Sequence, residues 1–296
     1  MNLSVIHPPP SFVSVVVPAR NATDFLAEQL DALASQDCAR PWEVVVVDNA
    51  STDGGGTTKV AESFAHRFRE LRVVHADDRL GAGYARNRGA ALARGDFLVF
   101  CDADDVVEPG WLGALVDAAP RGDLVGGWLR TVFSDGRLPR RQRPDPVQLD
   151  TALGFLPFAP SSNMGIRREV LDALGGWSEA YVGGGEDVEL SWRAQLAGWQ
   201  LVFTGEAVVR HRQRARLRDL ARQRYRYGLM DARVLSEHRA RGASRPSTHE
   251  IAMSLAWVVG RLPYLLSRED RMVWVGVVST RMGRVLGGLR YRTVCI

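Results

Sequence analysis

Short apolar runs recur along the first two thirds of the chain, and each stops at polar or turn-forming residues. The clearest run, Phe97 to Cys101, ends abruptly at Asp102. A continuous apolar run of this length is typical of a strand buried on both faces of a sheet. The first such strand is expected to end at Pro18, because proline cannot continue a hydrogen-bonded ladder. Further strands are predicted over residues 12–17, 42–47, 71–75, 123–134, 161–166, 201–204 and 207–210.

Between these runs, apolar residues recur at helical spacing. The stretch 23–35 carries Leu26, Leu30 and Leu33 on one face, with Thr23 or Asp24 as the expected cap. Strands that alternate with helices form βαβ units and a parallel sheet, so the predicted fold class is α/β. Other helices are predicted over 83–93, 111–118 and 169–174, over a segment with Val60, Phe64 and Phe68 on one face, and up to Gly198 with Leu190, Ala194 and Ala197 inward.

The chain from Arg212 onward differs in character. Residues 212–245 are Arg-dense with a helical pattern, and apolar runs at 251–260 and 272–278 are interrupted by arginines. In the second run Trp274, Val278, Met282 and Leu289 share one helical face. This pattern is typical of an interfacial helix, and equally of a helix packed on the protein's own catalytic domain. We expect a catalytic domain over 1–211 and a helical extension over 212–296.

Composition narrows the class of protein. With 296 residues and 46% hydrophobic residues, the chain is long enough for one large α/β domain with an appendage. Lys59 is the only lysine among 38 basic residues, so the arginine-rich stretches reflect a compositional skew and do not indicate nucleic-acid binding. Three scattered cysteines predict neither a disulfide framework nor a zinc site. No signal-peptide pattern and no spanning apolar stretch is visible, which predicts a cytoplasmic protein.

Candidate chemistry begins where the run 97–101 stops. In open α/β sheets, ligands bind beyond the carboxyl ends of the strands, and Asp102 and Asp104 follow directly there. Their carboxylates are hard oxygen ligands suited to Mg²⁺ or Mn²⁺ holding a diphosphate. The other interpretation is an acidic turn, since Asp is common in turns. A dinucleotide site is disfavoured, because the glycines at 81 and 83 lack the third glycine at the required spacing.

Several short polar motifs follow one another along the chain. They are 15–21 (VVVPARN), 47–54 (VDNASTDG), 85–89 (ARNRG), 102–105 (DADD), 176–177 (GW), 185–187 (GED) and the late His211. Taken in this order, they resemble family 2 glycosyltransferases of the GT-A fold over roughly residues 12–211. One departure from the family pattern is a small glycine extension at Gly54-Gly55-Gly56-Thr57.

The resemblance implies a nucleotide-sugar site with a divalent metal, Mn²⁺ or Mg²⁺. Asp48 is expected to read the nucleotide base, with the cap of a turn as the alternative. Asp102, Asp104 and His211 are expected to hold the metal, although a lone histidine alone would not suggest a ligand. The donor-binding residues are expected to be Pro18, Arg20, Asn21, Asp48, Arg86, Asp102 and Ala103.

Asp187 is the expected general base, because the attacking hydroxyl must lose a proton. Glu186 beside it raises the pKa of one of the pair, while a helix N-terminus favours the ionised carboxylate. We expect Asp187 to be mostly ionised at neutral pH. Trp177 is expected to stack on an acceptor sugar, with core packing as the alternative.

The sequence thus predicts a metal-dependent inverting glycosyltransferase. Its expected donor is a UDP-, GDP- or dTDP-sugar, and its acceptor a hydroxyl of a glycan, a lipid-linked molecule or a small molecule in cell-envelope or polysaccharide synthesis. No nucleic-acid partner is expected, and the C-terminal helices are expected to contact the inner face of the membrane. The loop 135–160 and the tail are expected to select the acceptor. Two alternatives remain, a nucleotidyltransferase and a catalytically inactive interaction module.

Overall fold

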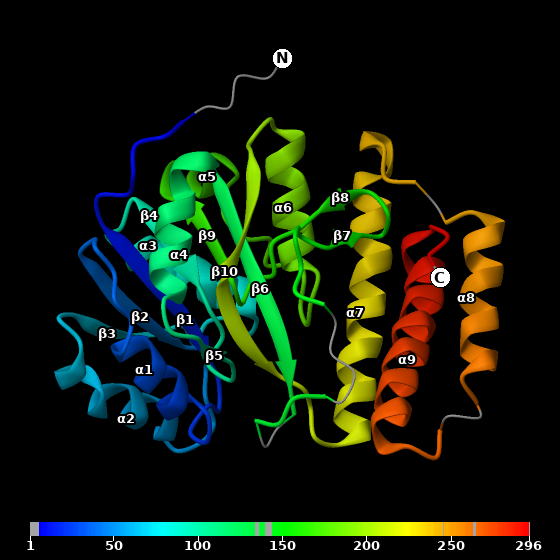
Figure 1. The fold of residues 1–296 in the computed structure, drawn as a ribbon, viewed down its shortest axis with the longest axis horizontal. Helices are drawn as coiled ribbons and strands as arrows, with labels where there is room; N and C mark the ends of the chain where they lie inside the picture. The colour runs from blue at the N-terminus through cyan, green and yellow to red at the C-terminus, as the bar shows by residue number, and fades with distance from the viewer. Residues whose placement is uncertain (1–5, 134–135, 140–143, 245, 263–264, 296) are drawn as a thin grey trace.

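A central eight-stranded sheet organises the computed structural model, which describes residues 6–133, 136–139, 144–244, 246–262 and 265–295 (Figure 1). The strand order is β3-β2-β1-β4-β9-β6-β10-β5, and β7 and β8 form a separate hairpin. The strands are β1 Val13–Ala19, β2 Trp42–Asp48, β3 Leu71–His75, β4 Phe97–Phe100, β5 Val106–Val107, β6 Leu124–Val132, β7 Thr151–Ala152, β8 Leu156–Pro157, β9 Met164–Arg167 and β10 Leu201–Arg212. The helices are α1 Leu26–Ala34, α2 Gly56–Ser63, α3 Ala82–Leu92, α4 Trp111–Ala118, α5 Arg168–Ala173, α6 Glu186–Leu196, α7 Leu217–His238, α8 Thr248–Gly260 and α9 Arg268–Tyr291.

The pairing of the strands confirms the predicted α/β class. Strands β3, β2, β1 and β4 are mutually parallel, and β9 runs antiparallel between β4 and β6. Because the carboxyl ends of parallel strands meet at one edge, Ala19, Asp48 and Phe100 bring their following loops together. The late strand β10 is parallel to β6 and carries His211 to the same sheet.

Helices cover both faces of the sheet, so its central strands are buried on both sides. Successive valines of β1 alternate between two hydrophobic clusters, as the two-residue period of a strand requires. Val15 and Val17 pack with Leu30 of α1 and Leu112 of α4, and Val16 packs on the opposite face with helices α3, α5 and α6.

Two strand predictions were wrong in detail. Pro18 lies inside β1 instead of ending it. Its nitrogen faces the side of β4, where pairing has already ended at Phe100, so no ladder hydrogen bond is lost. The strands expected at 201–204 and 207–210 form one strand, β10, whose register shifts between Phe203 and Val208.

Helix ends also differ from the prediction. Helix α1 begins at Leu26 without a side-chain cap, because Thr23 Oγ1 donates instead to Asp53 Oδ2 at 2.7 Å. Helix α2 ends at Ser63, although Phe64 and Phe68 still pack on the core. In α6, Leu190 and Ala194 are buried as expected, but Ala197 is exposed beyond the end of the helix. Of the predicted segments, residues 1–5, 134–135, 140–143, 245, 263–264 and 296 lie outside the described residues.

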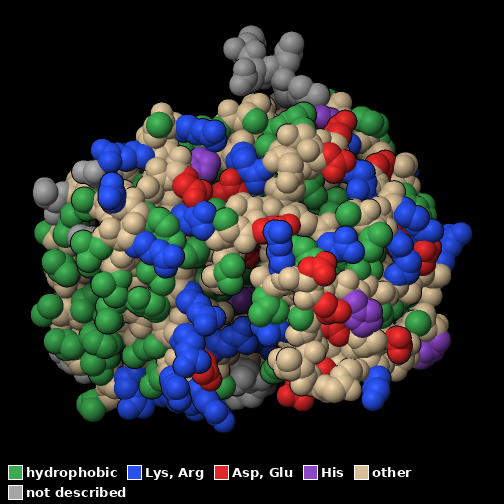
Figure 2. Space-filling view, turned by 180° about the vertical axis from the view of Figure 1, so that it is seen from behind, with side chains coloured by type: hydrophobic (Ala, Val, Ile, Leu, Met, Phe, Trp, Pro, Cys, Tyr) green, Lys and Arg blue, Asp and Glu red, His purple; other side chains and the backbone are tan. Residues whose placement is uncertain are grey.

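The C-terminal helices lie beside the sheet, with α7 nearest to it and α9 between α7 and α8 (Figure 1). Helix α7 shares a buried cluster with α6, in which Val234 and Leu235 pack with Val188 and Trp192. Seen from behind, hydrophobic side chains gather over the part of the surface formed by α8 and α9, with arginines at its border (Figure 2). Among the described helices, none is long and apolar enough to cross a membrane.

Candidate functional site

The acidic loop after β4 is held in place by the helix that follows β1. Gln29 Nε2 of α1 donates to the carbonyl oxygen of Asp102 at 3.1 Å. The side chains of Asp102 and Asp104 are about one-third exposed, at 31% and 32%, whereas Asp105 is buried. Arg214 Nη1, which follows β10, lies 3.1 Å from Asp104 Oδ2. The two predicted ligand carboxylates therefore face the open edge of the sheet.

His211 reaches this loop from 106 residues away. Its Nδ1 lies 3.0 Å from Asp105 Oδ2, and Asp105 Oδ1 also accepts the Arg212 backbone N–H at 3.2 Å. Burial lowers the pKa of His211, but the charge and the hydrogen bond of Asp105 raise it more, so the net shift is upward. A carboxylate on Nδ1 fixes the ring and leaves Nε2 for a ligand. Asp105 was not among the predicted site residues, although it lies in the same acidic motif.

Arg86 joins the acidic loop to α6. Its guanidinium is fully buried and donates from Nη2 to Asp102 Oδ1 at 2.7 Å and from Nη1 to Glu186 Oε1 at 2.9 Å. Burial lowers the pKa of Arg86, but the charges of Asp102 and Glu186 outweigh it and raise the pKa. Among the described residues, no group hydrogen-bonds the buried atoms Arg86 Nε and Glu186 Oε2. Arg86 thus joins Asp102, a predicted donor-binding residue, and Glu186, the neighbour of the expected base, in one ion-pair network.

Asp187 lies in the first turn of α6, directly after three glycines with positive φ. Its Oδ1 accepts the Val188 backbone N–H at 2.9 Å, and its Oδ2 accepts the Ser161 N–H at 3.4 Å. Burial, followed by the charge of Glu186, raises the pKa of Asp187 to about 7. The expectation of a mostly ionised carboxylate was therefore wrong, because desolvation outweighs the helix N-terminus.

Helix α7 contributes a residue that the sequence did not single out for the site. A Cβ built on Gly184 would lie 2.4 Å from the ring of Tyr227, so the tyrosine packs directly on the loop before Asp187. Burial raises the pKa of Tyr227; Arg224 lowers it, and the charges of Asp187 and Glu186 raise it further. The only sequence signal was a tyrosine among arginines, which does not reveal this contact.

Trp177 is in the core and not at an acceptor surface. It is 2% exposed, and its ring packs edge-on against Phe100 at 5.1 Å between centroids. The Arg86 guanidinium lies 5.0 Å from the ring centroid, so both neighbours occupy positions that a sugar would need. Asn87 fixes its backbone by accepting the Trp177 N–H at 2.8 Å and donating to its carbonyl at 2.9 Å. Trp177 therefore packs against the guanidinium of Arg86.

The loops after β1 and β2 interlock at the same edge. Asn21, with a positive φ of 50°, accepts the Thr52 N–H at 2.7 Å. Asp48 is 5% exposed and accepts the Ser51 N–H at 3.2 Å and the Thr58 hydroxyl at 2.8 Å. These are the contacts of a capped turn, and the base-reading role of Asp48 stays a prediction. The other expected donor residues here are Pro18, which is half-buried, Arg20, which is exposed, and Ala103, which is buried.

In the described part of the chain, no three His, Cys, Asp or Glu side chains are gathered closely enough to hold a metal unaided. Asp104 and His211 nevertheless influence one another electrostatically, together with Asp102.

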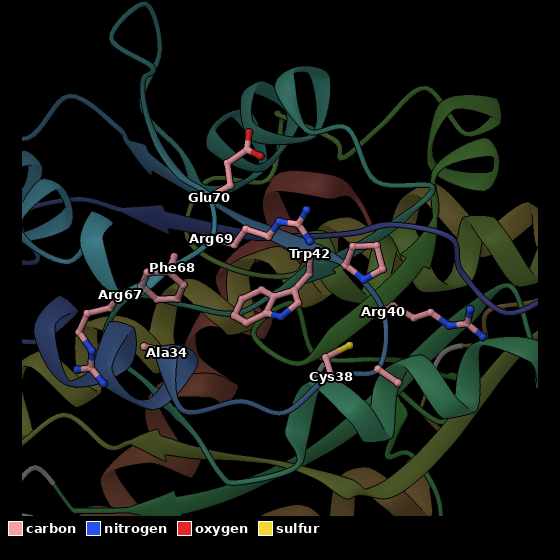
Figure 3. A pocket seen from close by; sticks show the side chains of 10 residues that line it. Ala34, Cys38, Arg40, Trp42, Arg67, Phe68, Arg69 and Glu70 are labelled. Atoms are coloured by element: carbon pink, nitrogen blue, oxygen red, sulfur yellow. The ribbon is translucent and has the colours of Figure 1, made fainter.

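A separate cavity of about 520 Å³ lies at the opposite edge of the sheet, where β2 begins (Figure 3). Trp42 and Phe68 form its aromatic wall, with ring centroids 5.9 Å apart, and Arg40 and Arg69 also line it. Its lining includes none of the predicted site residues, and we assign no chemistry to it.

Comparison with known families decides the class of this site. The model of glycosyl transferase family 2 matches residues 14–175, and that of glycosyl transferase family group 2 matches residues 146–283. The chain belongs to glycosyl transferase family 2. It is therefore a glycosyltransferase, as the motifs predicted.

Curated relatives and solved structures agree with this assignment. The chain is 28% identical to the glycosyltransferase AglE of Haloferax volcanii over 93% of its length and 90% of that protein. It is also 28% identical to the pre-mycofactocin glycosyltransferase of Mycobacterium tuberculosis over 97% of its length, and it covers 62% of that relative.

Two solved structures share the fold. The mannosyltransferase PcManGT from Pyrobaculum calidifontis, in complex with GDP-Man and Mn²⁺, matches with a TM-score of 0.62 and 19% identity over 95% of this chain and 87% of that one. Residues 1–349 of S. aureus TarS, in complex with UDP-GlcNAc, match with a TM-score of 0.55 and 18% identity, covering 95% of this chain and 92% of that one. These likenesses confirm the predicted GT-A fold.

Proposed function

We propose that this glycosyltransferase moves a sugar from a nucleotide diphosphate sugar to an acceptor hydroxyl, with inversion at the anomeric carbon and with Mn²⁺ or Mg²⁺ bound. One observation carries the proposal. Arg86 ties Asp102, at the expected donor side, to Glu186, which is next to the expected base Asp187. Donor-binding and proton-accepting groups are thereby held in a fixed relation at the edge of the sheet where ligands bind.

The donor class is supported by similar structures, which contain GDP-Man or UDP-GlcNAc. Because these proteins differ in nucleotide, they do not select among UDP, GDP and dTDP for this chain. The acceptor is proposed to be a glycan, a lipid-linked molecule or a small molecule in cell-envelope or polysaccharide synthesis. Residues 1–211 are proposed to bind both substrates, and residues 212–296 to form the helical extension.

The residues present fit a divalent cation. Asp102 and Asp104 offer carboxylate oxygens, and Asp105 leaves Nε2 of His211 for coordination. The guanidinium of Arg214 balances the negative charge of Asp104, as a bound cation would. A divalent ion held here by Asp102, Asp104, His211 and the donor diphosphate would neutralise the negative charge that develops on the leaving group.

The protein's own part in the reaction is proton transfer and positioning. Asp187 accepts the proton of the acceptor hydroxyl while the hydroxyl oxygen bonds to the anomeric carbon. The bond from that carbon to the diphosphate oxygen breaks, and its electron pair leaves with the nucleoside diphosphate. Glu186, paired with Arg86, positions this arrangement instead of accepting the proton, because its charge is already compensated.

Thermal unfolding with UDP-, GDP- and dTDP-sugars tests the proposal. A donor at about 100 times its Kd adds roughly 2.7 kcal/mol to the free energy of unfolding, so one donor class should raise Tm in the presence of Mn²⁺. Asp104→Asn should lose the metal-dependent part of the rise. Asp117→Asn, an exposed position on α4, should keep it. No rise with any donor, or an equal rise in Asp104→Asn, would contradict the metal-dependent site.

Two alternatives make different predictions. Family membership disfavours a nucleotidyltransferase, and only Arg20 follows the first strand where a triphosphate site needs a glycine-rich basic loop. An inactive interaction module would bind a nucleotide sugar without turnover. Slow Mn²⁺-dependent hydrolysis of the donor without acceptor would distinguish an enzyme from such a module.

A further inference from the structure

Helix α9 presents two chemically different faces. Its inner face carries glycines, and a Cβ built on Gly283 would lie 2.1 Å from the carbonyl oxygen of Tyr225 in α7. The apolar side chains are on the other side, at positions i, i+3, i+4 and i+7 of a helical stripe. Their exposed fractions are 56% for Met282, 45% for Val285, 45% for Leu286 and 75% for Leu289. Of the predicted apolar face, Met282 and Leu289 belong to this exposed stripe, whereas Trp274 and Val278 are half-buried.

Helix α8 adds a second exposed stripe. None of its described side chains is buried, although the helix is rich in apolar residues. Leu255 and Val259 are 55% and 64% exposed, four residues apart on one face of the helix. Leu262, just after the helix ends at Gly260, is 48% exposed. Leu266, between α8 and α9, is 94% exposed. Exposed apolar surface on this scale marks a site that another apolar phase covers.

Basic residues accompany the apolar stripes. Residues 248–295 contain seven arginines but only three acidic residues, Glu250, Glu269 and Asp270. Arg268, Arg271, Arg290 and Arg292 are exposed, and Figure 2 shows arginines along the border of the apolar area. Trp257 lies beneath the guanidinium groups of Arg261 and Arg281, at 5.2 and 5.7 Å. An apolar face bordered by arginines is typical of a helix at a membrane interface.

A hollow at the end of α9 also combines apolar side chains with an arginine. It has a volume of about 370 Å³ and is lined by the apolar side chains of Val285, Leu289 and Val294, together with Arg292. Apolar walls beside a guanidinium are complementary to an acyl chain beneath an anionic headgroup.

We propose that the outer face of α8 and α9 binds the surface of a lipid bilayer containing anionic headgroups. Arginine at the border attracts such headgroups, while leucine, valine and methionine enter the boundary of the acyl chains. A second copy of the chain is a poorer occupant, because a two-fold interface would bring the same arginine-rich borders together.

The position of α7 gives this surface a consequence for the acceptor. One face of α7 packs on α9 through Gly228, and Tyr227, the preceding residue, contacts the loop before Asp187. The outer face of α8 and α9 is thus separated from the candidate site by helix α7. This arrangement favours an acceptor that is embedded in the bilayer. The conclusion about the acceptor rests on the proposed function, whereas the bilayer contact itself does not.

Sedimentation with vesicles tests the bilayer contact without using activity. The full chain should sediment with phosphatidylcholine vesicles that contain phosphatidylglycerol, and less with phosphatidylcholine alone. Binding should fall steeply between about 0.05 and 0.5 M NaCl, as screening shortens the range of the charges. Arg268→Gln with Arg271→Gln should lower the partition coefficient by about 25-fold, at roughly fivefold per arginine near an anionic surface.

Substitutions in the apolar stripes test whether these side chains enter the bilayer, as distinct from attraction between the arginines and the anionic headgroups alone. Leu255→Glu with Leu289→Glu should abolish sedimentation while leaving Tm unchanged, because both side chains are exposed in the free protein. Leu92→Glu, 42% exposed on α3, is the matched control and should bind as the unchanged chain does. Equal recovery in the supernatant with and without anionic vesicles would overturn the proposal. So would a dimer in light scattering that Leu255→Glu with Leu289→Glu dissociates, since a second copy would then cover the face.

Discussion

At the scale of single residues, the site gives two adjacent carboxylates different environments. Glu186 pairs with the buried Arg86, whereas Asp187 accepts the backbone N–H groups of Ser161 and Val188. Burial beside a charged neighbour raises the pKa of Asp187 to about 7, which suits a group that must both accept and release a proton near neutral pH. The proposed base is therefore distinguished from its neighbour by the environment of each side chain.

Replacing Asp187 should slow transfer without weakening donor binding. Asp187→Asn keeps the shape of the side chain and can still accept one of the two backbone N–H groups, but it cannot accept a proton, so kcat should fall by about 10²–10⁴-fold. Donor affinity, measured by calorimetry with Mn²⁺, should be nearly unchanged, because the proposed donor residues are elsewhere. Asp172→Asn, an exposed carboxylate on α5, serves as the control. A kcat equal to that of the unchanged chain would exclude Asp187 as the base and direct attention to Glu186.

The raised pKa of Asp187 also predicts a pH profile. The base works when ionised, so kcat/KM should rise about tenfold per pH unit below the pKa of about 7 and level off above it. An aspartate with an ordinary pKa near 3.8 would give a flat profile over the same range. Initial rates at fixed Mn²⁺ from about pH 5.5 to 8.5 measure this. A flat profile in the unchanged protein would show that proton acceptance by Asp187 does not limit the rate.

At the scale of elements, glycine decides how the C-terminal helices pack. Gly228 in α7 faces Thr280 of α9, and Gly283 in α9 faces Tyr225 of α7, in both cases against backbone atoms. Backbone cannot move aside as a flexible side chain can, so both positions exclude even a methyl group. The two helices approach closely only because these residues lack side chains.

Adding a methyl group at Gly283 should therefore destabilise the protein. Gly283→Ala should lower the free energy of unfolding by about 1–3 kcal/mol through overpacking. Gly260→Ala in α8 is the matched control, because its Cβ would meet no atom within 4 Å and alanine favours a helix by roughly 1 kcal/mol. Thermal unfolding followed by circular dichroism compares the two. Equal Tm values for both variants would contradict the close approach of α7 and α9.

At the scale of the whole molecule, the site depends on segments from both ends of the chain. The loops after β1, β2 and β4 form one side, His211 comes from β10, and Tyr227 comes from α7. Helix α7 also covers α6, where Val234 and Leu235 pack with Trp192. The extension therefore shares buried surface with the catalytic part of the chain.

A fragment that ends at residue 212 should accordingly lose stability. Removing α7 uncovers Tyr181, Val188 and Trp192, which are 2%, 8% and 0% exposed in the intact chain. Each large apolar side chain left in water costs about 1.5–3 kcal/mol. Gel filtration and thermal unfolding should show aggregation or a much lower Tm than for the full chain. A monomeric fragment with the Tm of the full chain would show that residues 1–211 fold as an independent domain.

The sequence by itself determined the α/β class, most strands and helices, and the glycosyltransferase family that the comparison confirmed. Those features are local: the uninterrupted run at 97–101, the spacing of Leu26, Leu30 and Leu33, and short motifs such as Asp102-Ala103-Asp104 are legible without knowing what they contact. Their order along the chain follows the order of the βα units, so it places the carboxylates at one edge of the sheet.

Only the tertiary structure decided which partners each side chain meets, because those contacts join residues far apart in the chain. Arg86 meets Glu186 across 100 residues, and Asp105 meets His211 across 106. Burial, which has no local signature at a single residue, moved Trp177 from an expected acceptor surface into the core and raised the pKa of Asp187. Helical periodicity predicted an apolar face of α9, but only the packing on α7 decided that Met282 and Leu289 of that face are exposed while Trp274 and Val278 are half-buried.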